Sequence, residues 1–317
     1  MPNSFTFVLT DIEPNIEKPF EVIDGHRLRK ASKKEIKKIK EVVAKYNTMP
    51  YLGFPYEQIS VKEDEKDGFK NIKLDKDQWR YWVISFEGSN HEIGDLELAT
   101  TLLENDFEFG FTAIGDMPGM KEIEDEYSGF TFNSSVLSTF FTSEAYQKNI
   151  PKEVTKDDLE EIEPLYDAIK EHKSDYNFLE IAFQRWKHLK SLKRDSDMII
   201  IGLVLIIECL ITHKPKQNVN YDSIKHQIKT KIPLLSKRFK RNLDYEYYFQ
   251  RANPEKIWSL LYDYRSDIVH GKKAKVENKN QVLVGKDEIL NFLNEATKLL
   301  LISSLFEPKL VADLKRC

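Results

Sequence analysis

The feature that most constrains the fold of this chain is the apolar run from Met198 to Ile211, in which Glu208 is the only charged residue. The run is too short to span a lipid bilayer, which takes about 20 apolar residues in a helix. A helix that is apolar all round is instead typical of the centre of a helical bundle. The sequence therefore predicts a buried central helix here, with other helices packed around it.

Four further segments of the second half place apolar residues at helical spacing, as amphipathic helices of a bundle do. The apolar stripes are Phe178, Ala182, Trp186 and Leu189; Ile224, Ile228, Ile232, Leu235 and Phe239; Ile257, Leu261, Tyr264 and Ile268; and Ile289, Phe292, Leu293, Ala296, Leu299 and Leu300. The pair Asn253-Pro254 supplies an N-cap and a first helical residue for the third of these. We expect an all-α bundle over residues 176–317.

The first half of the chain mixes strand and helix signals. Segments rich in β-branched and aromatic residues predict strands at Ser4–Thr10, Trp79–Phe86 and Phe107–Ile114. Ser32 and Glu35 form a capping box, which predicts a helix from there to about Tyr46. This combination favours an α+β domain over residues 1–150, for which a sensor or regulatory role is expected.

The two parts are expected to divide near Pro151, with residues 151–175 as a connecting helix that contains Pro164. Their charges differ, because residues 176–317 carry 26 Lys+Arg and 16 Asp+Glu in a chain whose net charge is -4. A basic domain attracts polyanions without reading their sequence. Two ordinary solvated surfaces explain the difference equally well.

Several classes of site are excluded by the residues that the chain lacks. Cys209 and Cys317 lie far apart, so neither a disulfide scaffold nor a cysteine-built zinc site is expected. The common nucleotide-binding, zinc-protease and hydrolase motifs are missing, and the lone histidines His26 and His91 are assigned ordinary structural roles. The N-terminus has no signal-peptide pattern. We expect a cytoplasmic protein with no membrane segment, metal or cofactor.

The end of the fourth predicted helix contains the residue types that cleave a phosphodiester. In LLYDYRSDIVHG the apolar residues form the packing face, which leaves Arg265 and His270 on polar positions. An arginine can bind a phosphate bidentately and stabilise transition-state charge, and a histidine can transfer protons. Gly271 suits a left-handed helix end. Five residues along a helix separate two side chains by about 140°, so the pair converges only if the helix loosens or a second subunit contributes.

This cluster, in its bundle, resembles the HEPN superfamily and within it the Apea-like HEPN group. The resemblance covers roughly Asn177–Leu305 and includes Arg194 and Asp197 before the apolar run, Glu208 within it, and Ile224–Phe239. HEPN proteins are helical bundles that usually dimerise, with two Arg-x4–6-His motifs in one shared cleft. The resemblance implies a metal-independent ribonuclease, in which the ribose 2′-hydroxyl attacks the adjacent phosphate, acting as a toxin or antiviral defence effector.

The same resemblance assigns roles to residues of this chain. Arg265 and His270 become the catalytic pair, with Ser266, Asp267 and Glu208 in supporting positions. Family members often have Asn, Asp or His directly after the arginine, and Ser266 at this position favours slower cleavage or none. Capping of the helix, or binding of a neighbouring carboxylate, is the structural alternative for the arginine and the histidine.

Other residues are candidate contacts for RNA. Lys272, Lys273 and Lys275 follow the histidine and suit phosphate binding, although a solvated turn explains them almost as well. The tyrosines of a segment expected to be a polar loop, DYEYYFQ, are candidates for stacking on bases. Glu208 is expected to pair with an arginine or lysine of the bundle, because an unpaired buried charge is costly.

Three functions remain open at this point. The first is an RNA endonuclease that acts as a homodimer, with an antitoxin or a phage-derived trigger bound at the N-terminal domain. The second is a non-catalytic module whose cleft binds a nucleotide or a protein. The third is an adaptor in which the HEPN part serves for dimerisation.

Overall fold

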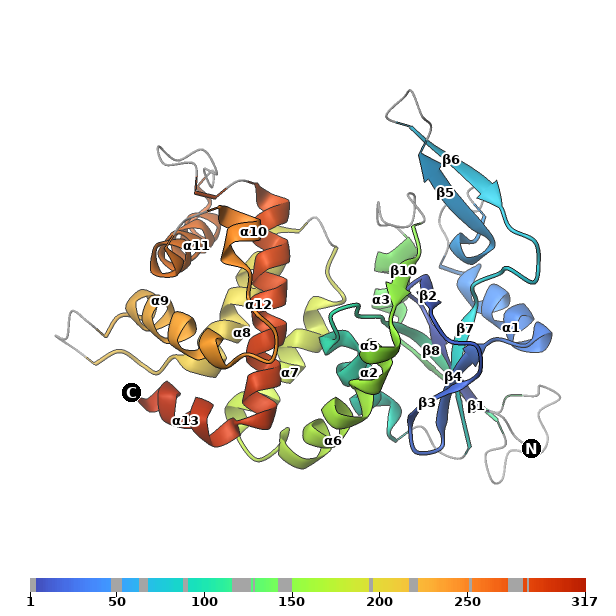
Figure 1. Ribbon diagram of the computed structural model, residues 1–317, viewed down its shortest axis with the longest axis horizontal. Helices are drawn as coiled ribbons and strands as arrows, with labels where there is room; N and C mark the ends of the chain where they lie inside the picture. Colours follow the sequence, from blue (N-terminus) through green and yellow to red (C-terminus); the bar gives the residue numbers. More distant parts are fainter. Residues whose placement is uncertain are drawn as a thin grey trace. The chain divides into compact units, whose positions relative to one another are not determined.

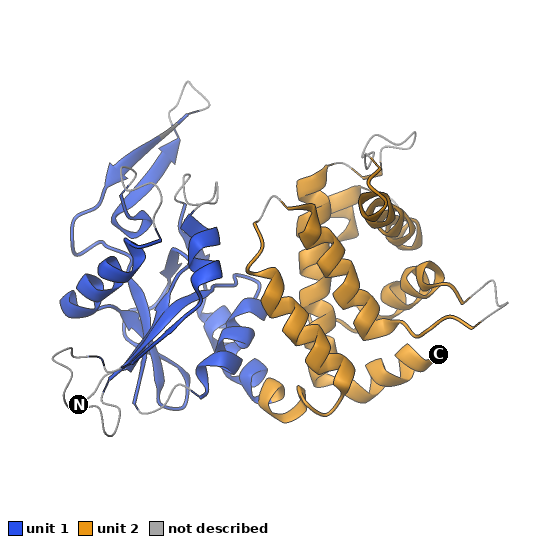
Figure 2. Ribbon diagram, turned by 180° about the vertical axis from the view of Figure 1, so that it is seen from behind, with its two compact units in different colours: residues 1–167 blue, residues 168–317 orange. Residues whose placement is uncertain are grey.

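The computed structural model of the chain describes residues 4–46, 53–62, 68–87, 91–115, 127, 129–141, 150–193, 196–216, 222–250, 253–272, 282–283 and 285–317. Residues 1–167 and 168–317 form two compact units, called unit 1 and unit 2 below (Figure 2). Unit 1 is built around a β-sheet and unit 2 is mostly helical. The expected order of an α+β part followed by an all-α part is therefore confirmed.

Unit 1 contains a six-stranded antiparallel sheet in the order β3-β4-β7-β1-β8-β9 (Figure 1). Its strands are β1 Ser4–Val8, β3 Phe20–Ile23, β4 His26–Lys30, β7 Trp82–Phe86, β8 Phe109–Ile114 and β9 Gly129–Phe132. All of β1 is buried, so both faces of the sheet are covered at its centre. The three segments predicted as strands contain β1, β7 and β8.

Three helices accompany this sheet: α1 Lys33–Val43, α2 Ile93–Leu102 and α3 Ser134–Phe141. Phe5 and Phe7 of β1 share one hydrophobic cluster with Ile39 of α1 and Leu137 of α3. Helix α2 lies on the side of the sheet away from α1 (Figure 1). The predicted capping box of α1 is present, with both reciprocal hydrogen bonds between its serine and its glutamate.

The segment after residue 150 belongs to unit 1, which corrects the expected boundary. Strand β10, Lys152–Val154, pairs in parallel with β2, Ile12–Pro14, and the short helix α5, Lys156–Glu160, follows it. The units divide inside α6, Ile162–His172, after Asp167. Residues 151–175 are therefore not a separate connection, because backbone hydrogen bonds fix their first part to β2. A two-stranded ribbon, β5 Gln58–Lys62 with β6 Phe69–Lys73, completes unit 1.

Unit 2 is a helical bundle around α8. Its helices are α7 Asn177–Leu189, α8 Asp197–Ile211, α9 Ile224–Leu235, α10 Tyr245–Phe249, α11 Pro254–Val269, α12 Lys286–Phe306 and α13 Pro308–Arg316. Helix α8 packs against α7, α9, α11, α12 and α13, which confirms the predicted central helix. Helix α12 is long and apolar enough to cross a membrane, but 72% of its apolar window is buried inside the structure, as in the core helix of a bundle.

Two helices of unit 2 differ from the expectation. Helix α9 ends at Leu235, just after Pro233, and a 3-10 turn at Ser236–Arg238 replaces its expected last turn. The expected polar loop is wrong for residues 245–249, which form α10. The side chain of Asp244 accepts a hydrogen bond from the backbone N–H of Tyr247 and so caps this short helix.

Candidate functional site around Arg265 and His270

Helix α11 carries the site, and its sequence determines where it begins. The side chain of Asn253 accepts a 2.8 Å hydrogen bond from the backbone N–H of Glu255, and Pro254 occupies the first turn. Both features were predicted from the sequence. The buried face of α11 consists of Ile257, Trp258, Leu261 and Tyr264. These contacts fix the rotation of the helix, so the remaining faces carry its polar residues.

The C-terminal end of α11 is a tight left-handed turn. His270 is the C-cap, and Gly271 follows with a φ of 66°, a conformation that suits glycine. The N–H of Gly271 donates to the carbonyl of Ile268 at 3.1 Å, and the N–H of Lys272 donates to the carbonyl of Asp267 at 2.9 Å. This pair of bonds is the Schellman arrangement. The helix therefore stops sharply at His270, as the glycine predicts, rather than loosening before it.

Arg265 points from α11 toward Glu208 on the central helix. Its Nη2 lies 3.6 Å from Oε1 of Glu208, and the two side chains are 19% and 18% exposed. This distance is long for a hydrogen bond. Neither Nε of Arg265 nor Oε1 of Glu208 has a hydrogen-bond partner within the described part of the chain. The guanidinium also lies over the ring of Tyr262, 5.8 Å from its centroid.

Burial governs the electrostatics of this pair. Burial raises the pKa of the Glu208 carboxyl, while the charges of Arg265 and Arg185 oppose that rise. Burial also raises the pKa of Tyr262, and the charge of Glu208 raises it further. Arg185 comes from α7 and donates to the carbonyl of Leu205 at 3.1 Å. The expected basic partner of Glu208 is therefore present, although no hydrogen bond between the two side chains strengthens the attraction.

The structure keeps the two predicted catalytic side chains in different surroundings. His270 is exposed at the helix end, whereas Arg265 is largely buried against α8. No hydrogen bond or ion pair links them among the described contacts of this single chain. The helix does not loosen before His270, so of the two routes to convergence that the 140° separation leaves open, the one within a single helix is not seen.

The supporting and RNA-binding candidates lie along the same turn. Ser266 is half-buried, and its carbonyl accepts from the N–H of His270 at 3.0 Å. Asp267 forms a 3.9 Å ion pair with Lys272, and both side chains are exposed. Such a pair contributes little free energy, so Lys272 remains available to a phosphate. Lys273 and Lys275 lie outside the described residues.

The sequence did not identify every residue of the site. Arg185 was missed because an exposed arginine beside the apolar stripe of a helix is usually only solvated. Tyr262 was expected at the rim or in the core, and its ring lies under the Arg265 guanidinium. Its spacing of three residues before the arginine is the available signal, since residues three apart on a helix are neighbours.

No cluster of three or more potential ligands that could hold a metal ion occurs in the described ranges of the chain. We find no match to this chain among family models, curated proteins or solved structures. We therefore infer the function of the chain from the residues of the site.

Proposed function

We propose that this chain is a metal-independent RNA endonuclease of the HEPN type, with Arg265 and His270 as its catalytic pair. The observation that supports the proposal best is that Arg265 is largely buried but only weakly paired. Its guanidinium is largely buried, faces Glu208 without a hydrogen bond between the side chains, and has an Nε with no partner among the described residues. A cation held in this way is poised to exchange a weak internal partner for a phosphate.

The proposed reaction needs a proton acceptor, a proton donor and a cation. The ribose 2′-hydroxyl loses its proton as its oxygen bonds to the adjacent phosphorus. The bond from phosphorus to the 5′-oxygen of the next nucleotide breaks, and that oxygen takes up a proton. The products are a 2′,3′-cyclic phosphate and a 5′-hydroxyl. His270 moves protons, and Arg265 stabilises the charge that develops on the phosphate oxygens.

The proposal includes a homodimer. The sharp end of α11 leaves His270 exposed, so it can reach a cleft formed with a second copy, whose Arg265 and His270 complete the site. Lys272 and the net positive charge of residues 176–317 would hold the RNA backbone, in a manner that weakens with salt. We assign unit 1 a regulatory role, with an antitoxin or a phage-derived component as its partner.

The test is cleavage of a mixed RNA pool by the full chain, with and without EDTA. We expect cyclic-phosphate ends in both conditions. His270→Ala should lower the rate by about 10²–10⁴-fold, and Arg265→Ala by about 10²–10³-fold. His188→Ala is the matched control, because His188 is also an exposed histidine near a helix end of unit 2. Undiminished cleavage by the His270 and Arg265 variants would contradict the proposal.

A non-catalytic module that binds a nucleotide or a protein is the second candidate. Two observations favour it: the ion pair that occupies Arg265 in the single chain, and Ser266 in a position where HEPN nucleases often have Asn, Asp or His. RNA binding that is lost in Arg265→Ala, without product at any protein concentration, would support this module over the nuclease.

A further inference from the structure

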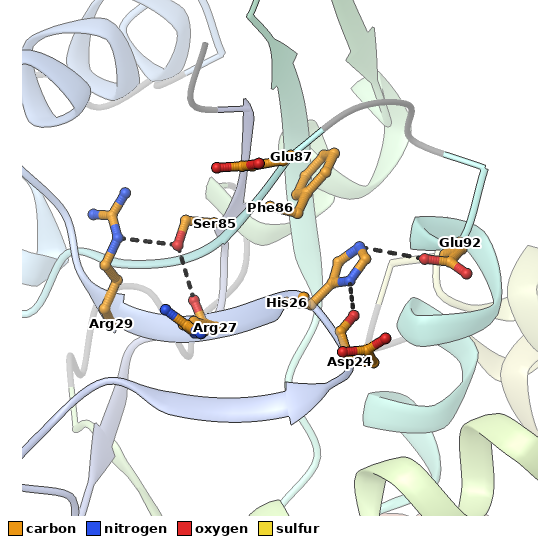
Figure 3. A pocket seen from close by; sticks show the side chains of 9 residues that line it. Asp24, His26, Arg27, Arg29, Ser85, Phe86, Glu87 and Glu92 are labelled. Atoms are coloured by element: carbon orange, nitrogen blue, oxygen red, sulfur yellow. Dashed lines mark hydrogen bonds and ion pairs between the residues drawn. The ribbon is translucent and has the colours of Figure 1, made fainter. Parts of the chain in front are cut away.

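His26 and His213 are both largely buried and both contact acceptor groups, but only the contacts of His213 fix its protonation state. Figure 3 shows His26 in a polar pocket of unit 1, which is formed by the β3–β4 turn, β4, β7 and the residue before α2. Its Nδ1 lies 3.0 Å from the carbonyl of Asp24, and its Nε2 lies 3.9 Å from Oε2 of Glu92. The second distance is too long for a hydrogen bond, so a neutral ring and a protonated ring both fit these contacts.

His213 follows the central helix α8 and lies between two other segments of unit 2. Its Nε2 lies 2.8 Å from Oδ1 of Asp222, just before α9, and its Nδ1 lies 2.9 Å from the backbone carbonyl of Lys315 on α13. The His213 and Asp222 side chains are 19% and 12% exposed. The side chain of Gln227, on α9, accepts from the backbone N–H of His213 at 2.9 Å and donates to its carbonyl at 3.2 Å. The backbone of His213 is therefore fixed, and both of its ring nitrogens face an acceptor.

The carboxylate of Asp222 accepts hydrogen bonds at both of its oxygens. Oδ2 accepts from the backbone N–H of Lys216 at 2.6 Å, and Oδ1 accepts from Nε2 of Gln227 at 3.2 Å. The bond from Lys216 holds the pKa of Asp222 below its usual value, and the charge of His213 lowers that pKa further. The carboxyl group therefore carries no proton that it could donate to the ring near neutral pH.

These contacts require both ring nitrogens of His213 to be donors. A backbone carbonyl can only accept a hydrogen bond, and the same is true of an ionised carboxylate. A neutral imidazole has one N–H and one lone pair, so it would turn its lone pair toward either Lys315 or Asp222. The doubly protonated ring satisfies both partners, and its charge strengthens the bond to the carboxylate.

Other titratable groups lie around this ring. Nζ of Lys231, on α9, donates to the same carbonyl of Lys315 at 3.4 Å, and the charge of Cys317 acts on Lys231. The charge of Lys216 acts on the carboxylate. Burial lowers the pKa of Lys231 and the pKa of Lys315. Among these kinds of group only histidine has an ordinary pKa between about pH 5 and 8, so we expect the ring to titrate there.

The C-terminal end of α13 depends on polar contacts of this kind, because only Val311 and Ala312 of this helix are buried. When the His213 ring loses one proton, the remaining N–H stays with the carboxylate, which is the stronger acceptor. Nδ1 then turns a lone pair toward the carbonyl of Lys315, and the hydrogen bond between them is lost. The stabilising contribution of this bond is therefore present at acidic pH and is lost as the pH rises through the range in which histidine titrates.

We infer that His213 is a pH-dependent latch, which holds the end of α13 against the bundle at acidic pH and releases it as the pH rises. Asp222 provides the charge that keeps the second proton on the ring, and the backbone carbonyl of Lys315 is the group that is held. This inference goes beyond the proposed nuclease activity and does not depend on it.

Amide hydrogen exchange of the full chain tests the latch between about pH 5.5 and pH 8. Protection factors, which correct for the effect of pH on exchange itself, should fall about tenfold or more for the last residues of α13. Over the same range, the ¹⁵N signals of the His213 ring should change from two protonated nitrogens to one, with the proton kept on Nε2. Unchanged protection, or a ring with a single proton at the acidic end, would overturn the inference.

Two variants show whether the ion pair is responsible. Asp222→Asn replaces the carboxylate by an amide, which can donate to a neutral ring or accept from a protonated one, so its α13 protection should vary by less than about twofold. His188→Gln removes an exposed histidine of α7 and should keep the pH dependence of the unmodified chain. Full pH dependence in Asp222→Asn, or its loss in His188→Gln, would overturn the latch. The ring signals need no variant, so they test the latch even where a substitution disturbs the fold.

Discussion

Among the ion pairs of the described residues, those of Arg80 with Asp11 and of Arg265 with Glu208 are both buried enough for desolvation to affect them, but they differ in their hydrogen bonding. Arg80 and Asp11 are each 7% exposed at the side chain and meet through two hydrogen bonds of 2.9 and 2.8 Å. Arg265 and Glu208 are more exposed and lack such bonds. A buried pair with full hydrogen bonding holds a structure together, whereas a loosely paired cation exchanges partners easily. This contrast is why we assign a structural role to Arg80 and a functional one to Arg265.

Substitution of Arg80 tests the structural role. Arg80→Met leaves the Asp11 carboxylate buried without its partner, and we expect it to lower the free energy of unfolding by roughly 3–5 kcal/mol at neutral pH. Arg27→Met is the control, because its ion pair with Glu21 is exposed and should contribute at most about 1 kcal/mol. Urea denaturation of both variants gives the comparison. Similar losses in the two variants would contradict the structural role.

The cost of Arg80→Met should also depend on pH. Burial raises the pKa of Asp11 from 3.8 to about 6, against the opposing hydrogen bonds from Arg80. A folded pKa above the unfolded one means that the stabilising contribution of this group is complete below pH 3.8 and is lost as the pH rises through 6. At pH 5 a neutral Asp11 no longer needs the arginine. We therefore expect a smaller destabilisation at pH 5 than at pH 7, and equal values would contradict this explanation.

At the scale of the element, the ends of the helices are fixed by named side chains. The central helix α8 ends inside the bundle, where its last carbonyls have no partner within the helix. Nζ of Lys315, on α13, donates to the carbonyls of Cys209 and Thr212, both at 2.6 Å. Nζ of Lys231, on α9, donates to the carbonyl of Ile211 at 3.1 Å. Two lysines therefore satisfy the carbonyl end of α8, where the helix dipole also favours positive charge.

This arrangement predicts an effect of Lys315→Met. The variant keeps the apolar stem and loses the ammonium, so two carbonyls of α8 lose their donor. We expect the free energy of unfolding of unit 2 to fall by roughly 1–3 kcal/mol, with faster amide hydrogen exchange near Ile211. Lys309→Met is the matched control, because Lys309 is an exposed lysine of the same helix. Equal hydrogen exchange in the two variants would contradict the capping role.

The elements that the sequence predicted are those with a local signal. The capping box at Ser32 and the glycine at 271 act within a few residues and are present as expected. Strands β3 and β4 were not predicted, because they are short and their exposed positions carry charged side chains. Strand β4 is stabilised by pairing with β7, which is distant in the sequence, and β3 in turn pairs with β4. Position in the sheet, rather than propensity, determines them.

Some features of the candidate site were likewise predicted from local sequence, and others depend on tertiary packing. The helical spacing predicts that Arg265 and His270 lie off the packing face. The apolar run around Glu208 predicts that this residue needs a basic partner. The identity of that partner and the proximity of Arg185 depend on how α7, α8 and α11 pack. The pocket of unit 1 was not predicted, because it joins residues of three elements around a histidine that seemed ordinary in the sequence. Juxtapositions of this kind arise only from tertiary structure.

At the scale of the whole molecule, the division into two units does not follow the change in composition. The sequence becomes basic and helical after residue 175, but the structure divides inside α6. Several contacts attach the segment after residue 150 to unit 1. Lys152 forms an ion pair with Asp106, and Asp158 accepts a hydrogen bond from the Asn105 side chain at 3.0 Å. Val154 and Leu159 are buried.

These contacts predict how fragments of the chain behave. A fragment of residues 1–175 keeps β10, α5 and α6, whereas residues 1–150 leave β2 unpaired and remove the buried side chains of Leu159 and Ile162. At roughly 1.5–3 kcal/mol for each buried side chain, we expect the shorter fragment to unfold about 10 °C lower. Thermal unfolding followed by circular dichroism gives both midpoints. Equal midpoints would mean that the boundary lies at residue 150 after all, and that the pairing of β10 with β2 adds no stability to unit 1.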